Sequence, residues 1–336
     1  NVLDEHMFYC KPTHDSLPAP EACAVTGITP QLCEKKGFIE HEFIKKIHDE
    51  FSKPGTCIVG YNSIAFDDEY TRHTLFRNFL DPYSWHWQNG NARWDILNVA
   101  RFCYAHKEEG SLNWVKNEKN RPIFKLDRLA PANHIEHTNA HDAMADVRAT
   151  IGIARIIKDT QPKFFNYALS LNDKKEVAQL VKPLHPMLLT TSSFGYKSSF
   201  TRLVTSICNH PEYNDRSIVF NLNQDPEIFL ELESEELKTL TFSRKSDLPK
   251  GIEKLDLSEL VYNKSPMFVC SPNSDNFKLS PILIEKFELN LDKCLKNLRF
   301  IQKNSQSIED KVRAIYRNDS DREPSRDVDQ SLYDGF

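Results

Sequence analysis

The chain has 336 residues, of which 40% are hydrophobic and 27% charged, and its formal net charge is −5. This balance is typical of a globular protein with two domains of roughly 150 residues each, and it excludes a disordered chain. No apolar run approaches the roughly 18 residues of a membrane-spanning helix, and no basic-then-apolar signal segment opens the chain. The slight acidic excess differs from the basic surplus of many nucleic-acid-binding proteins, although a local basic groove is compatible with it.

The eight cysteines are scattered along the chain, and none forms a C-x-x-C pair. The sequence therefore does not predict a zinc site. In a long chain without a signal segment, we expect these cysteines to be free, buried apolar side chains in a reducing cytoplasm.

The first half of the chain alternates strand and helix patterns. Residues 2–9 read as a strand. Hydrophobic residues recur at every fourth position from residue 39 to residue 51, which predicts an amphipathic helix. The β-branched run at 56–61 predicts a buried strand. Further helices are expected over residues 67–79, 93–104 and 143–158. This alternation predicts an α/β domain with helices packed on a sheet.

The pattern changes near Gln161-Pro162, where a β-rich region begins. Short strand-like runs separated by Asn, Pro, Gly and Ser predict a small barrel. These runs lie at residues 187–191, 203–207 and 217–222. A helix is expected at 227–240 and another around Leu291, Leu295 and Leu298. We therefore predict three parts: a first domain over residues 1–160, a β-rich domain over residues 161–315, and a polar linker over residues 316–336.

Asp67 lies in the motif Asn62-x-x-x-Phe66-Asp67, where a predicted strand ends and a helix begins. A carboxylate is favoured electrostatically near a helix N-terminus. Taken alone, the motif is more typical of an aspartate that caps the helix, a role open to Asp67 or Asp68.

Asp146 lies in the first turn of a predicted Ala-rich helix, off its apolar stripe and facing the same end of the domain as Asp67. Two carboxylates offer the oxygen ligands that a hard cation such as Mg²⁺ prefers. His141, just before the helix, could take a proton from an attacking water. Taken alone, this pattern is also compatible with a capping Asp142 and a surface histidine.

The order of the motifs is more informative than any one of them. Along the chain come Thr26-Gly27-Ile28-Thr29, Asn62…Phe66-Asp67, Lys125-Leu126-Asp127-Arg128-Leu129 and His141-x-Ala143-x-x-Asp146. This series resembles the DEDDh family of 3′→5′ exonucleases. Further segments are similar to bacterial exonuclease I: residues 8–12, 81–83, 93–95, 139–146 and 332–336. The resemblance implies an RNase H-like mixed sheet flanked by helices, followed by an SH3-like β-rich domain with inserted helices.

The resemblance also implies an activity and a site. The expected enzyme is a metal-dependent exonuclease that degrades single-stranded DNA from 3′ to 5′ and releases 5′-mononucleotides. A complete site would hold two Mg²⁺ ions, with Mn²⁺ as an alternative. By motif, Asp67 and Asp146 correspond to metal ligands and His141 to the general base.

The family's other two carboxylates belong to an Asp-x-Glu on the first strand of its sheet. No such motif precedes Asp67, and the adjacent Asp4-Glu5 would point its two side chains to opposite faces of a strand. We therefore expect the chain to be a fragment that lacks this first strand and also the family's C-terminal helical domain.

Candidate substrate-binding residues lie around a loop that contains Tyr83, Trp85 and Trp87. Exposed aromatic rings can stack on unpaired bases, although alternate members of such a group are often core residues. By resemblance, arginines on the flanking helices would meet phosphates. Lys125 stands where the family has Arg, so the charge remains but the bidentate fork is lost. The candidates are Arg72, Tyr83, Trp87, Arg101 and Lys125.

The family implies single-stranded DNA and the single-stranded-DNA-binding protein as partners, with roles in recombination and mismatch repair. We expect a cytoplasmic monomer that does not bind membranes. Two alternatives stay open. One is a DEDDh exoribonuclease or proofreading subunit, although the β-rich second domain is evidence against it. The other is a non-catalytic single-strand-binding relative, which fits the absent Asp-x-Glu but not the presence of both His141 and Asp146.

Overall fold

The computed structural model describes residues 2–13, 18–137, 143–244, 246–249, 251–270 and 279–317. Its chain divides into two compact units, the first made of Asn1–Leu97 and Glu109–Phe165, the second of Asn98–Glu108 and Asn166–Phe336. In the described part of the chain, no helix is long and apolar enough to cross a membrane. The linker predicted at the C-terminal end lies, from residue 318 onward, outside the described residues.

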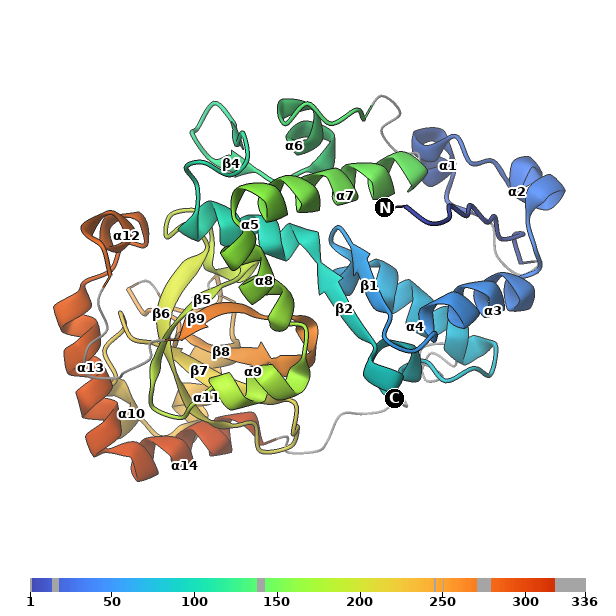
Figure 1. Ribbon diagram of the computed structural model, residues 1–336. Coiled ribbons are helices and arrows are strands. Elements are labelled where there is room, and N and C mark those ends of the chain that lie inside the picture. The colour runs from blue at the N-terminus through green and yellow to red at the C-terminus, as the bar shows by residue number, and fades with distance from the viewer. Residues whose placement is uncertain are drawn as a thin grey trace. The chain divides into compact units, whose positions relative to one another are not determined.

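The first unit combines helices with two small sheets (Figure 1). Its helices are α1 (Pro20–Thr26), α2 (Pro30–Lys36), α3 (Glu40–Phe51), α4 (Asp67–Arg77), α6 (Leu126–Ala132) and α7 (Ala143–Thr160). Helices α5 (Ile96–His106) and α8 (Pro162–Ser170) continue from the first unit into the second. The helices predicted from the periodicity around residues 39–51, 67–79 and 143–158 are confirmed as α3, α4 and α7.

A parallel pair of strands forms the centre of this unit. β1 (Cys57–Gly60) pairs with β2 (Ala92–Asp95), and Gly60 lies opposite Asp95. A short antiparallel pair, β3 (Val115–Lys116) and β4 (Pro122–Ile123), lies apart from them in the same unit. The strand predicted at 56–61 is confirmed, but its predicted burial is wrong, because the residues of β1 alternate between exposed and half-buried. All eight cysteines are free as expected. The expectation of burial holds for Cys103, Cys208 and Cys294, whereas four others are only half-buried and Cys57 on β1 is exposed.

Two sequence-based assignments in this unit are wrong. Residues 93–95 were expected to open a helix but form part of β2, because their backbone groups pair with β1 and that pairing outweighs local helix propensity. Residues 2–9 form no strand. Their neighbourhood has one isolated bridge, Cys10 to Phe38, and Leu3 is 97% exposed. A strand-like sequence needs a neighbouring strand to satisfy its backbone, and no described strand lies beside it.

The second unit contains a five-stranded antiparallel sheet in the order β8-β7-β6-β5-β9. Its strands are β5 (Pro186–Thr190), β6 (Thr201–Asn209), β7 (Arg216–Asn221), β8 (Leu257–Val261) and β9 (Met267–Cys270). The three strand-like runs predicted between residues 187 and 222 are therefore confirmed as β5, β6 and β7.

Helices surround this sheet, and α14 packs on β6 and on α11 (Figure 1). The bounds are α9 (Lys174–Leu180), α10 (Ile228–Glu231), α11 (Ser234–Phe242), α12 (Pro281–Lys286), α13 (Leu291–Lys303) and α14 (Ser305–Tyr316). The helix predicted at 227–240 is divided into α10 and α11. Glu233 starts α11 through a capping box with Glu236, which fixes a helix start inside the predicted span. The helix expected around Leu291–Leu298 is confirmed as α13.

His106, near the end of α5, is a neutral histidine packed in the second unit. Its ring lies 4.8 Å from that of Phe102 and 5.3 Å from that of Phe287. Nε2 lies 3.4 Å from the hydroxyl of Thr190. Burial, together with a smaller effect of the charge of Lys286, lowers the pKa of His106 to about 3. The fold therefore favours the uncharged imidazole.

This pKa predicts acid destabilisation of the second unit. The folded-state pKa lies below the unfolded value of about 6.5, so the unfolded chain takes up a proton first as the pH falls. Stability is lost between roughly pH 6.5 and pH 3, by about 1.4 kcal/mol per pH unit once the unfolded chain is protonated. We expect His106→Gln to flatten this dependence in urea titrations at pH 7, 6, 5 and 4. Thr190→Val, which removes the neighbouring hydroxyl but keeps the imidazole, should retain the slope. Equal slopes for the His106→Gln chain and the unsubstituted chain would contradict the assignment.

Candidate active site

A hollow of about 840 Å³ lies in the first unit, between β1, the start of α4 and one face of α7. Its wall is largely apolar and includes Ile58, Trp94 and Val147. Two carboxylates predicted from the sequence to act together, Asp67 and Asp146, both border it. The fold thus places side chains that are 79 positions apart in the sequence on one cavity.

A tight turn brings Asp67 to this position. Asn62 has a left-handed backbone with φ 66°, a conformation that asparagine tolerates. A Cβ on Gly60 would lie 2.4 Å from the Cβ of Ser63, so only glycine permits the chain to fold back here. After one 3₁₀ turn, Ser63–Ala65, helix α4 begins at Asp67.

Asp95 holds this turn in place. The sequence placed it in the segment 93–95, which resembles the family, but gave it no role. Its carboxylate is buried, and the residue is 2% exposed. Oδ1 accepts hydrogen bonds from the backbone N–H groups of Asn62, at 2.8 Å, and Leu97, at 3.0 Å. Oδ2 accepts a longer bond from Ile64, at 3.4 Å. The available signal was an acidic residue at the carboxyl end of a strand, but residues 93–95 were assigned to a helix.

Neither acidic residue at the start of α4 caps the helix. The N-cap position belongs to Phe66, and no side chain makes a capping hydrogen bond there, so the capping interpretation of Asp67 and Asp68 is wrong. Asp68 is 5% exposed and pairs with Arg93, with Oδ2 at 2.9 Å from Nη1. Burial raises the pKa of Asp68 to about 6 even with this arginine beside it.

Asp67 differs from its neighbour because it borders solvent. The surrounding protein still displaces part of the water around its carboxyl group, and this desolvation raises the pKa of Asp67 above its ordinary value. The negative charges of Asp67 and Asp95 in turn raise the pKa of Asp68. Three carboxyl groups are therefore concentrated at this end of the sheet, and a cation would relieve their repulsion.

Asp146 lies in the first turn of α7, and its side chain is 49% exposed. Its Oδ1 lies 2.7 Å from Nε2 of His137, whose side chain is only 2% exposed. No role was predicted for His137 from the sequence, so this contact was missed. His141, the predicted general base, lies within residues 138–142, outside the described residues.

The chemistry of the donors fits a divalent cation in kind. Aspartate oxygens are the ligands that hard cations such as Mg²⁺ take, and Asp67 and Asp146 supply them on one hollow. Over the described ranges, no group of three or more His, Cys, Asp and Glu side chains is arranged to hold an ion. The described residues therefore place two of the predicted carboxylates, Asp67 and Asp146, on this hollow.

The aromatic loop divides into a core residue and surface residues. Trp85 is 1% exposed and donates from Nε1 to the carbonyl of Pro82 at 2.8 Å. Trp87 is 61% exposed, and Tyr83 is half-buried. The guanidinium of Arg72 lies 5.7 Å from the centre of the Tyr83 ring and pairs with Glu69. The structure thus brings Arg72 and Tyr83 together and removes Trp85 from the exposed set.

The two other candidate cations lie elsewhere. Lys125 is exposed at the start of α6, next to Leu126, which lines the hollow. Arg101 belongs to the second unit, where Nη1 donates to Oδ1 of Asn98 at 2.9 Å.

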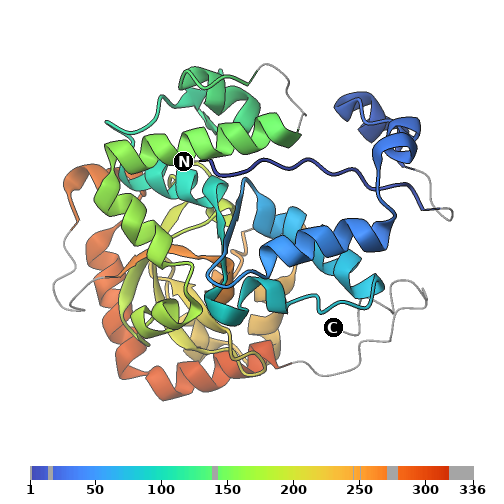
Figure 2. The ribbon, with the colours of Figure 1, turned by 45° about the vertical axis from the view of Figure 1, so that its right-hand side comes forward.

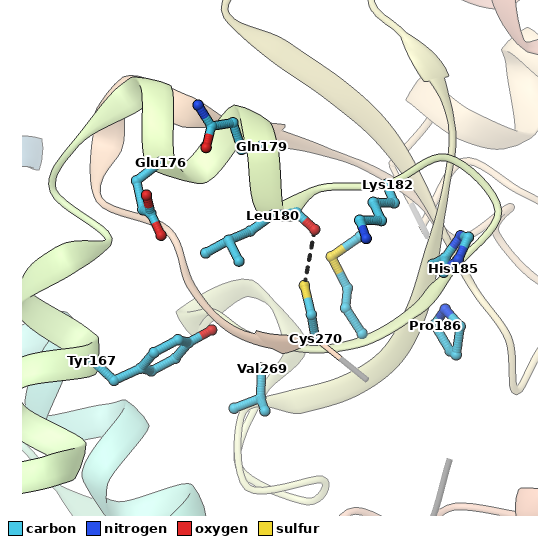
Figure 3. Close-up of a pocket in the computed structure, with 10 residues that line it drawn as sticks. Tyr167, Glu176, Gln179, Leu180, Lys182, His185, Pro186, Val269 and Cys270 are labelled. Carbon is cyan, nitrogen blue, oxygen red and sulfur yellow. Dashed lines mark hydrogen bonds between the residues drawn. The ribbon is translucent and has the colours of Figure 1, made fainter. Parts of the chain in front are cut away.

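A second hollow, of about 470 Å³, lies in the second unit (Figure 3). Its lining includes Tyr167, which donates to the carbonyl of Phe268, and Cys270, which donates to that of Leu180. Burial raises the pKa of the Cys270 thiol to about 11, so the thiol stays protonated near neutral pH and is a poor nucleophile. With one carboxylate, Glu176, this hollow also lacks the acidic pair found in the first unit.

Comparison with known proteins assigns both halves of the chain. Residues 1–154 match the family model "Exonuclease", and residues 172–318 match "Exonuclease I SH3-like domain". Exodeoxyribonuclease I of Escherichia coli (strain K12) is 41% identical over 340 residues, which cover 100% of this chain and 70% of that protein.

Solved structures agree with this similarity. E. coli exonuclease I in complex with a dA16 oligonucleotide superposes with a TM-score of 0.92 and 40% identity, covering 100% of this chain and 71% of that one. The zinc-ion-bound form of an E. coli ExoI–ssDNA complex superposes with a TM-score of 0.89 and is 40% identical in sequence. An ExoI/SSB-Ct complex superposes with a TM-score of 0.87 and is 39% identical. Both cover 100% of this chain and 70% of the other. The α/β unit followed by an SH3-like unit, expected from the sequence, is confirmed.

The hydrogen bonds of Asp95 predict a large effect on stability. Asp95→Ala leaves buried backbone N–H groups without their acceptor and should lower the free energy of unfolding of the first unit by about 3 kcal/mol. Asp81→Ala is the matched control, since the exposed Asp81 also accepts from two backbone N–H groups, those of Tyr83 and Ser84. Water can replace Asp81, so its loss should cost about 1 kcal/mol or less. Urea unfolding checks both values, and equal losses would refute the role given to Asp95.

Proposed function

Because the chain belongs to the exodeoxyribonuclease I family, we propose that it hydrolyses single-stranded DNA in the 3′ to 5′ direction and releases 5′-mononucleotides. The observation that carries the proposal is the placement of Asp67 and Asp146 on one hollow of the first unit. Similarity over the whole chain to exodeoxyribonuclease I, and to a solved complex with a dA16 oligonucleotide, supports the substrate class.

The reaction depends on a divalent cation, and Mg²⁺ is the ion that the donor set favours, with Mn²⁺ as a substitute. Asp67 and Asp146 would hold it through their carboxylate oxygens. Bound there, the cation would supply Lewis-acid stabilisation of the charge that develops on the phosphodiester. The raised pKa of Asp67 fits this role, because a carboxylate that is poorly solvated by water gains more from a metal ligand.

The remaining steps belong to side chains and to the backbone. His141 accepts the proton of the attacking water, as its place in the motif ahead of Asp146 suggests. Asp95 fixes the turn that carries Asp67, so that this ligand is held before substrate arrives.

The DNA strand contacts the first unit through aromatic and cationic side chains. Trp87, largely exposed, offers a stacking surface for a base, and Tyr83 a second one. Arg72 and Lys125 provide positive charge for phosphates there, and Arg101 provides it in the second unit. Residues 1–160 would then form the catalytic domain and residues 161–315 the SH3-like domain.

The single-stranded-DNA-binding protein is the proposed protein partner, supported by the solved ExoI/SSB-Ct complex. The chain would act as a monomer in the bacterial cytoplasm, where chromosomal DNA is accessible, in recombination and mismatch repair.

The metal ligands predict a sharp loss of activity. On 5′-labelled single-stranded DNA with Mg²⁺, Asp146→Asn should reduce the rate of 3′-end shortening by at least a factor of about 10³, because the loss of one carboxylate removes charge that the cation needs. EDTA should have the same effect. Asp159→Asn, an exposed aspartate at the other end of α7, is the control and should be fully active. Shortening from the 5′ end, or faster cleavage of RNA than of DNA, would contradict the proposal.

Arg72 predicts a change in binding rather than in chemistry. Arg72→Ala should raise KM for single-stranded DNA by roughly five- to ten-fold and leave kcat almost unchanged. It should also reduce the salt dependence of log KM by about 0.7, because one phosphate of the strand is no longer neutralised. Arg77→Ala is the control, since Arg77 also forms an ion pair but lies in the last turn of α4, at the opposite end of the helix from Asp67. If both variants shift KM equally, the phosphate-binding role assigned to Arg72 is wrong.

A further inference from the structure

His137 is buried against the carboxylate of Asp146. Its side chain is 2% exposed, and Nε2 lies 2.7 Å from Oδ1. An ionised carboxylate can only accept, so the imidazole donates from Nε2–H. Over the described part of the chain, no other side chain bonds to this carboxylate, and Oδ2 is available for another ligand.

The fold clamps the segment that carries His137. Helices α6 and α7 lie side by side (Figure 2), and Ile135, in the segment that follows α6, contacts both helices. The N–H of Ile135 donates to the carbonyl of Ala130 in α6, at 3.0 Å. On the α7 side, a Cβ on Gly152 would lie 2.8 Å from Cδ1 of Ile135, so the isoleucine occupies the space that this glycine leaves open. His137 is therefore placed two residues beyond a fixed point.

The second ring nitrogen shows that His137 is not optimised for stability. Nδ1 is buried and has no hydrogen-bond partner among the residues that the structure describes. A buried polar atom without a partner is destabilising, and an apolar ring of similar size would avoid this penalty. Packing alone therefore does not explain an imidazole here, whereas the hydrogen bond from Nε2 to Asp146 does.

We propose that His137 is a positioning residue that orients the Asp146 carboxylate for a divalent cation. The proposal rests on the metal-binding role proposed above for Asp146. A ligand carboxylate that is only half-buried can rotate, and one hydrogen bond to Oδ1 restricts that rotation while leaving Oδ2 to the metal. Partners of this kind, which bond to a ligand rather than to the metal, commonly change metal affinity by 10- to 100-fold.

Two substitutions in the full chain separate this role from a structural one. His137→Phe keeps a ring of similar size and removes the donor, whereas His137→Gln places an amide N–H close to the position of Nε2. Mn²⁺ binding is measured from the free-ion signal in electron paramagnetic resonance, and Tm is measured in EDTA. We expect the Phe variant to bind Mn²⁺ roughly ten-fold more weakly with an unchanged or higher Tm. The Gln variant should bind almost as tightly as the unsubstituted chain.

The Asp146→Asn variant distinguishes the metal-binding role of Asp146 from the positioning role of His137. If Asp146→Asn and the unsubstituted chain bind Mn²⁺ equally, Asp146 is not a ligand, and both the proposed metal role and the positioning role are overturned. If Asp146→Asn loses Mn²⁺ but His137→Phe retains full affinity, the positioning role alone is overturned. Equal loss of affinity in the Phe and Gln variants, together with a lower Tm, would make His137 merely structural and would also overturn it.

Discussion

The hydrogen bonds between the buried carboxylate of Asp95 and the backbone of the turn after β1 are the constraint on which the first unit depends. They join the ends of two parallel strands, where Gly60 lies opposite Asp95, to the turn that leads into α4. A buried carboxylate is stable only if its charge is satisfied, and backbone N–H groups of the turn contribute to this here. Because these bonds fix the turn, the position of Asp67 is set by the sheet and not by a flexible loop.

The same end of the sheet concentrates negative charge. Asp68 is neutralised in part by Arg93, whereas Asp67 faces the hollow across from the first turn of α7. Buried and like-charged carboxyl groups have raised pKa values, and the fold tolerates them where a cation can bind. His137 belongs to this arrangement, since it joins Asp146 to the segment between α6 and α7.

The periodicity of hydrophobic residues was sufficient to predict the helices and strands whose sequence pattern agrees with their packing. Helix α3 follows from apolar residues at every fourth position, and the strands β5, β6 and β7 follow from short β-branched runs between turn residues. Periodicity failed for segments whose secondary structure depends on pairing with a strand that is distant in the sequence. Residues 93–95 carry a helix-like pattern but pair with β1, and residues 2–9 carry a strand-like pattern without a described strand beside them. Backbone pairing is a tertiary property, so local pattern cannot decide it.

The sequence by itself determined the order of the motifs, the chemical type of the donors and, through resemblance, the family of the chain. Asp67 and Asp146 could be recognised because their motifs occur at the start of helices in the expected order. Only the tertiary structure decided which side chains support them. The roles of Asp95 and His137 could not be read from local sequence, because each side chain contacts a residue outside its own element. Trp85 and Trp87 show the same limit: burial distinguishes two tryptophans that are two positions apart, and burial depends on what packs against them.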